Sequence, residues 1–109
     1  NTPWCIGLGS GDATGWPGTD WMEDIMLRTH EPSVYDAWVT NEMPFNDPKV
    51  IEAMDFFGSF ARNDAYVDGG AAAVATTDFR DSPKGLKLVL LKNLLNFQSG
   101  LGHLLQLQL

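Results

Sequence analysis

Trp16 stands in a loop, where a large aromatic side chain needs a reason. It follows Gly15 and precedes Pro17, so the indole either fills a core or serves as a flat platform for a ligand. A sugar ring fits such a platform, because C–H groups cover one ring face and hydroxyls surround the rim. Carboxylates, amides and guanidinium groups nearby can bind those hydroxyls in pairs. Trp4, Trp21 and Trp38 fall on expected strand or helix positions and are predicted to be core residues.

A second group of chemically capable side chains occupies residues 77–85. Asp78 and Asp81 bracket Phe79 and Arg80 at the end of an expected strand, where α/β proteins place ligand contacts. Two carboxylates held roughly 5–10 Å apart are the acid and base of glycoside hydrolysis, so one interpretation is a carbohydrate-active enzyme. The alternative is a turn in which one aspartate caps a helix and the other pairs with Arg80.

Metal and phosphate sites are not expected. The two histidines, His30 and His103, are far apart, and the single cysteine, Cys5, belongs to neither. No ligand spacing is present, so no metal and no cofactor is predicted. His30 is interpreted as a residue at the C-terminal end of a helix. The glycines of residues 7–11 miss the dinucleotide-binding spacing by one position, and no Lys-Ser/Thr pair follows them.

The composition argues against nucleic acid and anionic lipid as binding partners. The 109 residues suffice for one small domain, and the formal net charge is −7. An acidic chain lacks the basic footprint that nucleic acid or anionic lipid requires. No run approaches the roughly 18 apolar residues of a membrane helix, and the start has no signal-peptide pattern, so no direct membrane insertion is expected.

The charge divides the chain near residue 86. Residues 1–86 hold all fourteen acidic and five of the seven basic side chains, a net −9. Residues 87–109 hold two lysines, no acid and ten leucines, a net +2. This change of composition predicts that two different sequences have been joined.

The expected elements give an α/β order. Apolar runs predict short strands over residues 4–8 and 73–77. Capping and periodicity predict one helix from Thr19 or Asp20, with Glu23 in the capping-box position, to about Thr29. A shorter helix follows Ser33, and a third begins at Pro48 with Asp47 as its cap. A further helix is expected over residues 83–96, while residues 100–109 fit a strand and a helix equally.

Three separated motifs carry a resemblance to a known family. The residues concerned are Thr2–Gly7 with Ser10–Asp24, then Val34–Asp36 with Pro44–Pro48, then Ala73–Gly85. In this order they resemble the extracellular solute-binding proteins of family 1, and more narrowly the alpha-glucoside-type binding proteins of bacterial carbohydrate ABC transporters. The resemblance covers residues 2–86.

The resemblance implies a fold and a function. Such proteins are two-lobed, of the type II maltose-binding-like fold, and close around an oligosaccharide that they deliver to a membrane permease from the periplasm or cell surface. It implies no catalysis. Residues 1–86 would then be an internal piece, mostly of the C-terminal lobe. The site residues that it implies are Trp16 as the stacking platform and Asp12, Thr14, Asp78 and Arg80 as hydroxyl partners.

The sequence departs from the family after Leu86. The family continues with a Pro-Pro-x-Cys segment, whereas this chain reads Lys-Leu-Val-Leu-Leu-Lys-Asn. We expect residues 87–109 to be a frameshifted or artificial tail, which would leave Cys5 without the disulfide partner that the missing segment supplies. An inactive truncated polypeptide therefore stays open as an alternative.

Overall fold

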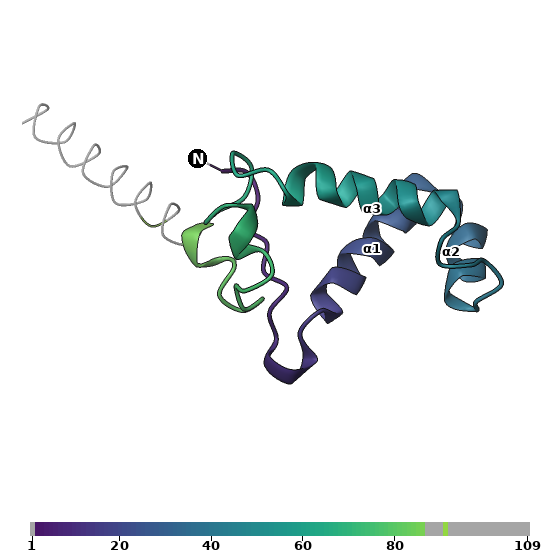
Figure 1. Ribbon diagram of the computed structural model, residues 1–109, viewed down its shortest axis with the longest axis horizontal. Helices are drawn as coiled ribbons and strands as arrows, with labels where there is room; N and C mark the ends of the chain where they lie inside the picture. Colours follow the sequence, from purple (N-terminus) through teal and green to yellow (C-terminus); the bar gives the residue numbers. More distant parts are fainter. Residues whose placement is uncertain (1, 87–90, 92–109) are drawn as a thin grey trace, which may run out of the picture.

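The described part of the chain contains three α-helices and two short 3-10 helices, with turns and irregular segments between them. The computed structural model describes residues 2–86 and Leu91. The elements are η1 (Gly11–Ala13), α1 (Trp16–Thr29), α2 (Pro32–Val39), α3 (Pro48–Ala61) and η2 (Ala71–Ala73). In Figure 1, α3 runs across the top, α1 descends from it, and α2 lies at the end far from the N-terminus. Most of the helix expected over residues 83–96, and all of residues 100–109, lie outside the described residues.

The helix starts follow local sequence signals. The Asp47 side chain accepts from the backbone N–H of Lys49 at 2.9 Å, which confirms it as the cap of α3. The predicted start of α1 at Thr19 or Asp20 is wrong, because α1 begins at Trp16. Gly15, at φ 113°, turns the chain into the helix, and the fixed φ of Pro17 suits the first turn.

The helices enclose a core of their own. Met22, Ile25 and Met26 of α1 pack against Val50 and Ala53 of α3, with Val34, Tyr35 and Trp38 of α2 at the margin. Each helix satisfies its backbone internally, so this packing supplies the contacts that isolated helices of such length need.

The two predicted strands are wrong for the described residues. The segment 4–9 is extended, yet it makes only the isolated parallel bridges Trp4↔Val67 and Gly9↔Asp78. Residues 71–73 form η2, and turns follow it. A β-ladder needs a second extended segment beside the first. Here the segment that faces residues 4–9 turns at Gly69 and Gly70, both at φ 82°, and is not extended. The architecture described is therefore helical, with an extended N-terminal segment, rather than α/β.

A second core joins the extended segment to the end of α3. Ile6, Phe60, Ala61, Val67 and Val74 are buried together. The Trp4 ring stacks on that of Phe60 with centroids 4.8 Å apart. Among the described residues, no helix has both the length and the hydropathy of a membrane span.

Candidate sugar-binding site

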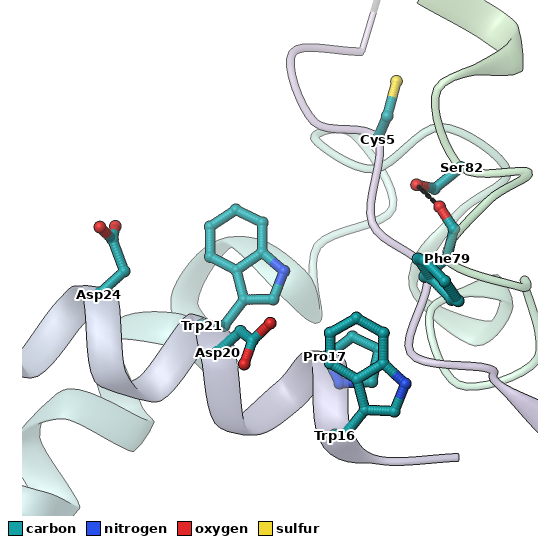
Figure 2. Close-up of a pocket in the computed structure, with 9 residues that line it drawn as sticks. Cys5, Trp16, Pro17, Asp20, Trp21, Asp24, Phe79 and Ser82 are labelled. Atoms are coloured by element: carbon teal, nitrogen blue, oxygen red, sulfur yellow. Dashed lines mark hydrogen bonds between the residues drawn. The ribbon is translucent and has the colours of Figure 1, made fainter. Parts of the chain in front are cut away.

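A cavity lies where the start of α1 meets the turn that follows residue 77. Its volume is about 360 Å³, and aromatic, acidic and small residues line it (Figure 2). The lining residues are Cys5, Gly7, Trp16, Pro17, Asp20, Trp21, Asp24, Phe79 and Ser82. The cavity therefore combines flat apolar walls with carboxylates and a hydroxyl, the mixture that binding sites for small polar ligands use.

Trp16 forms one wall and is half-exposed. Its exposed fraction is 42%, so the described residues cover only part of the indole. The indole Nε1–H donates to Ser10 Oγ at 2.9 Å. The ring of Phe79 meets it edge to face, with centroids 4.9 Å apart and an interplanar angle of 71°. The Trp16 ring is therefore contacted by Ser10 of the preceding loop and by Phe79 of a turn much later in the sequence.

Two glycines let the extended segment approach the turn. A Cβ on Gly7 would lie 2.7 Å from the carbonyl oxygen of Thr77, and one on Gly9 would lie 2.9 Å from the same atom. Only glycine permits backbones this close. The N–H of Gly9 donates to Thr77 O, and the N–H of Phe79 donates to Gly9 O, both at 2.9 Å. The glycine run therefore places Phe79 beside Trp16.

Asp78 and Arg80 form a two-pronged ion pair. Arg80 Nε donates to one carboxylate oxygen at 2.8 Å and Nη2 to the other at 3.0 Å, while the Arg80 backbone N–H donates to the first at 2.9 Å. These hydrogen bonds lower the pKa of Asp78 to about 2 and raise the pKa of Arg80. The guanidinium also lies over the Phe79 ring, 5.7 Å from its centroid. The pair supports Phe79 but does not line the cavity.

The same contacts argue against the acid–base interpretation. A general acid needs a pKa raised toward neutrality, whereas that of Asp78 is lowered. Asp81 is paired with Lys84, whose Nζ lies 2.8 Å from its carboxylate. The geometry agrees with the alternative interpretation, a turn in which one aspartate, Asp78, pairs with Arg80.

Asp12 and Thr14 lie on the loop before Trp16 and outside the cavity lining. Asp12 is exposed on η1. The Thr14 hydroxyl donates to Gly11 O at 2.7 Å and accepts from the Ser10 N–H at 3.0 Å. Of the five predicted site residues, the structure brings only Trp16 into the cavity.

Four residues that line the cavity are not among the predicted site residues: Asp20, Asp24, Phe79 and Ser82. Trp16, Asp20 and Asp24 recur at intervals of four, the spacing of one helix face. A helix that begins at Thr19 or Asp20, as predicted, would leave Trp16 outside this face. Asp24 also accepts from Arg28 Nε at 2.7 Å, an ion pair at the surface of α1. Within the described residues, no three His, Cys, Asp or Glu side chains gather as metal ligands would.

Comparison with known proteins reveals two relatives. The chain is 73% identical over 84 residues to the alpha-glucosides-binding periplasmic protein AglE of Rhizobium meliloti (strain 1021), covering 77% of this chain and 18% of that protein. It is 53% identical over 85 residues to the osmoprotective compounds-binding protein GgtB of Synechocystis sp. (strain ATCC 27184 / PCC 6803 / Kazusa), covering 78% of this chain and 20% of that protein. The chain thus spans about one fifth of the length of these relatives. No family model matches it, and no solved structure matches it significantly.

The names of the two relatives bear on the class of function. Both are named as binding proteins, and neither name gives a catalytic activity. The names of the relatives thus describe solute binding, the function that the motif resemblance implies. Over most of its length, the chain corresponds to a segment of the periplasmic solute-binding proteins, the family that its motifs resemble.

Proposed function

We propose that this chain is part of a substrate-binding protein that captures an oligosaccharide of the alpha-glucoside class for uptake by an ABC transporter. The observation that carries the proposal is Trp16, half-exposed on the wall of a cavity that carboxylates share. The stronger of the two similarities, to a protein named for alpha-glucosides, supports this ligand class over osmoprotective compounds in general.

The cavity provides complementary contacts for a pyranose ring. The exposed part of the Trp16 indole packs against ring C–H groups, and the Asp20 carboxylate accepts hydrogen bonds from hydroxyls. Asp12, Asp78 and Arg80 lie on the adjoining loop and turn, where they bind further hydroxyls of a longer ligand. Thr14, whose hydroxyl is engaged in the loop, contributes by holding that loop.

The whole protein acts by closure. In this proposal residues 1–86 belong to the C-terminal lobe, and residues 87–109 are a tail foreign to the family. A second lobe closes over the sugar, and the closed form is what the membrane permease recognises. The protein works in the periplasm or at the cell surface, in keeping with the periplasmic location in the name of the Rhizobium relative.

A graft tests the proposal in a complete clamp. The matching 84 residues of the Rhizobium protein are replaced by those of this chain, and binding of alpha-glucosides is measured by calorimetry. Trp16→Ala in the graft is expected to weaken binding about tenfold to a hundredfold, since it removes both the stacking and the buried area.

The matched control is Phe56→Ala, which removes an exposed aromatic side chain outside the cavity. It is expected to leave the affinity unchanged. Equal affinity of the Trp16→Ala graft and the unaltered graft would contradict the proposal. Release of reducing ends during incubation with alpha-glucosides would instead support the enzyme alternative.

A further inference from the structure

The orientation of the Trp16 indole is set by Ser10. The indole nitrogen has one proton, which lies in the ring plane, and it is donated to Ser10 Oγ at 2.9 Å. This bond fixes the rotation of the ring about its own side-chain axis. Phe79 constrains the tilt through its edge-to-face contact (Figure 2). Ser10 precedes Trp16 in the sequence and Phe79 follows it, and the two contacts restrict the rotation and the tilt of the ring respectively.

Ser10 is itself held in place. Its backbone N–H donates to Thr14 Oγ1 at 3.0 Å, and its carbonyl accepts from the N–H of Ala13 at 3.1 Å. The Thr14 hydroxyl continues the chain of bonds to Gly11 O. The acceptor for the indole is therefore a fixed point in the loop.

We propose that Ser10 is a positioning residue that holds the Trp16 indole in the orientation that stacks on a sugar. The proposal rests on the proposed function, because it assigns Trp16 to ligand stacking. A half-exposed ring held in advance loses less side-chain freedom when a ligand binds. Ser10 therefore affects affinity without needing to contact the sugar.

The first experiment reads the bond directly in the full 109-residue chain. The four indole N–H signals are resolved by ¹⁵N nuclear magnetic resonance, and that of Trp16 is assigned with Trp16→Phe. Ser10→Ala is expected to shift this signal and speed its exchange with water about threefold to tenfold, as loss of one hydrogen bond predicts. Ser10→Thr, which keeps the hydroxyl, is expected to restore both.

The second experiment measures binding in the graft described above. Ser10→Ala is expected to weaken alpha-glucoside binding about threefold to tenfold, and Ser10→Thr to restore it. Circular dichroism checks that the helices are intact in both variants. The Thr variant separates positioning from a general effect on the loop.

The outcomes separate the two proposals. If Trp16→Ala weakens binding and Ser10→Ala leaves both the exchange rate and the affinity unchanged, the role of Ser10 is overturned and the proposed function stands. If Trp16→Ala has no effect on binding, the proposed function is overturned, and with it the role of Ser10 in stacking. Faster exchange together with weaker binding in Ser10→Ala, both rescued by threonine, supports the proposal.

Discussion

The helical part of the chain, residues 16–61, and the extended part, residues 2–15 with 62–86, are stabilised in different ways. In the helical part, backbone groups pair within each helix and the core of Met22, Ile25, Met26, Val50 and Ala53 is assembled from neighbouring helices. In the extended part, single backbone bonds join residues about sixty positions apart, such as Trp4 N–H to Tyr66 O and Leu8 N–H to Val74 O. Local structure therefore forms the first part, and long-range contacts form the second.

The candidate site lies at the boundary between these parts. Trp16 and Asp20 come from the start of α1, whereas Phe79 and Ser82 come from the turn of the extended part. Trp16 belongs to the helical part, whereas the two residues that contact its ring, Ser10 and Phe79, belong to the extended part. The geometry of the cavity therefore depends on the part of the chain that long-range contacts hold in place.

The largest expected effect is loss of the helical core. Met26 is fully buried, and Met26→Ala is expected to lower the free energy of unfolding of the helical part by about 2–5 kcal/mol, because a cavity replaces the side chain. Denaturant titration followed by circular dichroism measures this. Leu27→Ala, on the same helix but 49% exposed, is the control and should change stability by less than about 0.5 kcal/mol. Equal effects of the two variants would contradict the packing described.

A smaller effect, confined to the extended part, is expected from Gly7→Ala. The new Cβ would meet the carbonyl oxygens of Thr77 and Asp78 at 2.7 and 2.9 Å, so the turn must move away, at about 1–3 kcal/mol. Amide hydrogen exchange of Gly9 and Phe79 should speed up, while amides within α1 and α3 keep their protection.

The control is Gly18→Ala, in the first turn of α1. Its Cβ would meet only Leu8 methyl carbons, at 3.8 and 3.9 Å, so no displacement is expected and the Gly9 and Phe79 amides should exchange as in the parent. Unchanged exchange of those two amides in Gly7→Ala would show that the close approach of the two backbones does not form.

The same division explains which elements the sequence predicted well. The serine signal at Ser33 predicts the start of α2 to within a residue of Pro32, and Asp47 with Pro48 predicts the start of α3. These signals act within one turn of helix. The strands over residues 4–8 and 73–77 were predicted from apolar runs alone, and a run cannot show whether a second extended segment lies beside it.

The site was predicted only in part for a related reason. The glycine and proline that flank Trp16 predict a loop there, whereas Trp16 is the first residue of α1. Phe79 and Ser82 join it only through the close backbone approach at Gly7 and Gly9, which no local pattern encodes. Asp78 and Arg80 were expected to face a ligand, yet their nearest partners are each other. Residue types alone do not show that two neighbouring charges pair with each other, or whether they also line a cavity.

An effect of opposite sign should appear in the helical part. Gly58 lies within α3, and a Cβ there would meet only Arg62 Cδ at an ordinary 3.5 Å. Gly58→Ala is therefore expected to stabilise the helical part by about 0.5–1 kcal/mol, because alanine loses less backbone freedom on folding. Denaturant titration checks the sign against Gly7→Ala. Destabilisation by both alanines would remove the contrast between the two parts.

The smallest effect is electrostatic and belongs to the extended part. Hydrogen bonds from Arg80 lower the pKa of Asp78 from the ordinary 3.8 to about 2, so the folded turn holds the ionised form more strongly than the unfolded chain does. The stabilisation is thus fully present above the ordinary pKa and is lost as the pH falls through the interval down to about 2. Nuclear magnetic resonance of the Asp78 carboxyl carbon gives the midpoint directly. Arg80→Ala should return that midpoint toward the ordinary value, whereas Arg62→Ala, which alters an arginine outside the pair, should not. A low midpoint that survives Arg80→Ala would assign the shift to the backbone N–H of residue 80 rather than to the guanidinium.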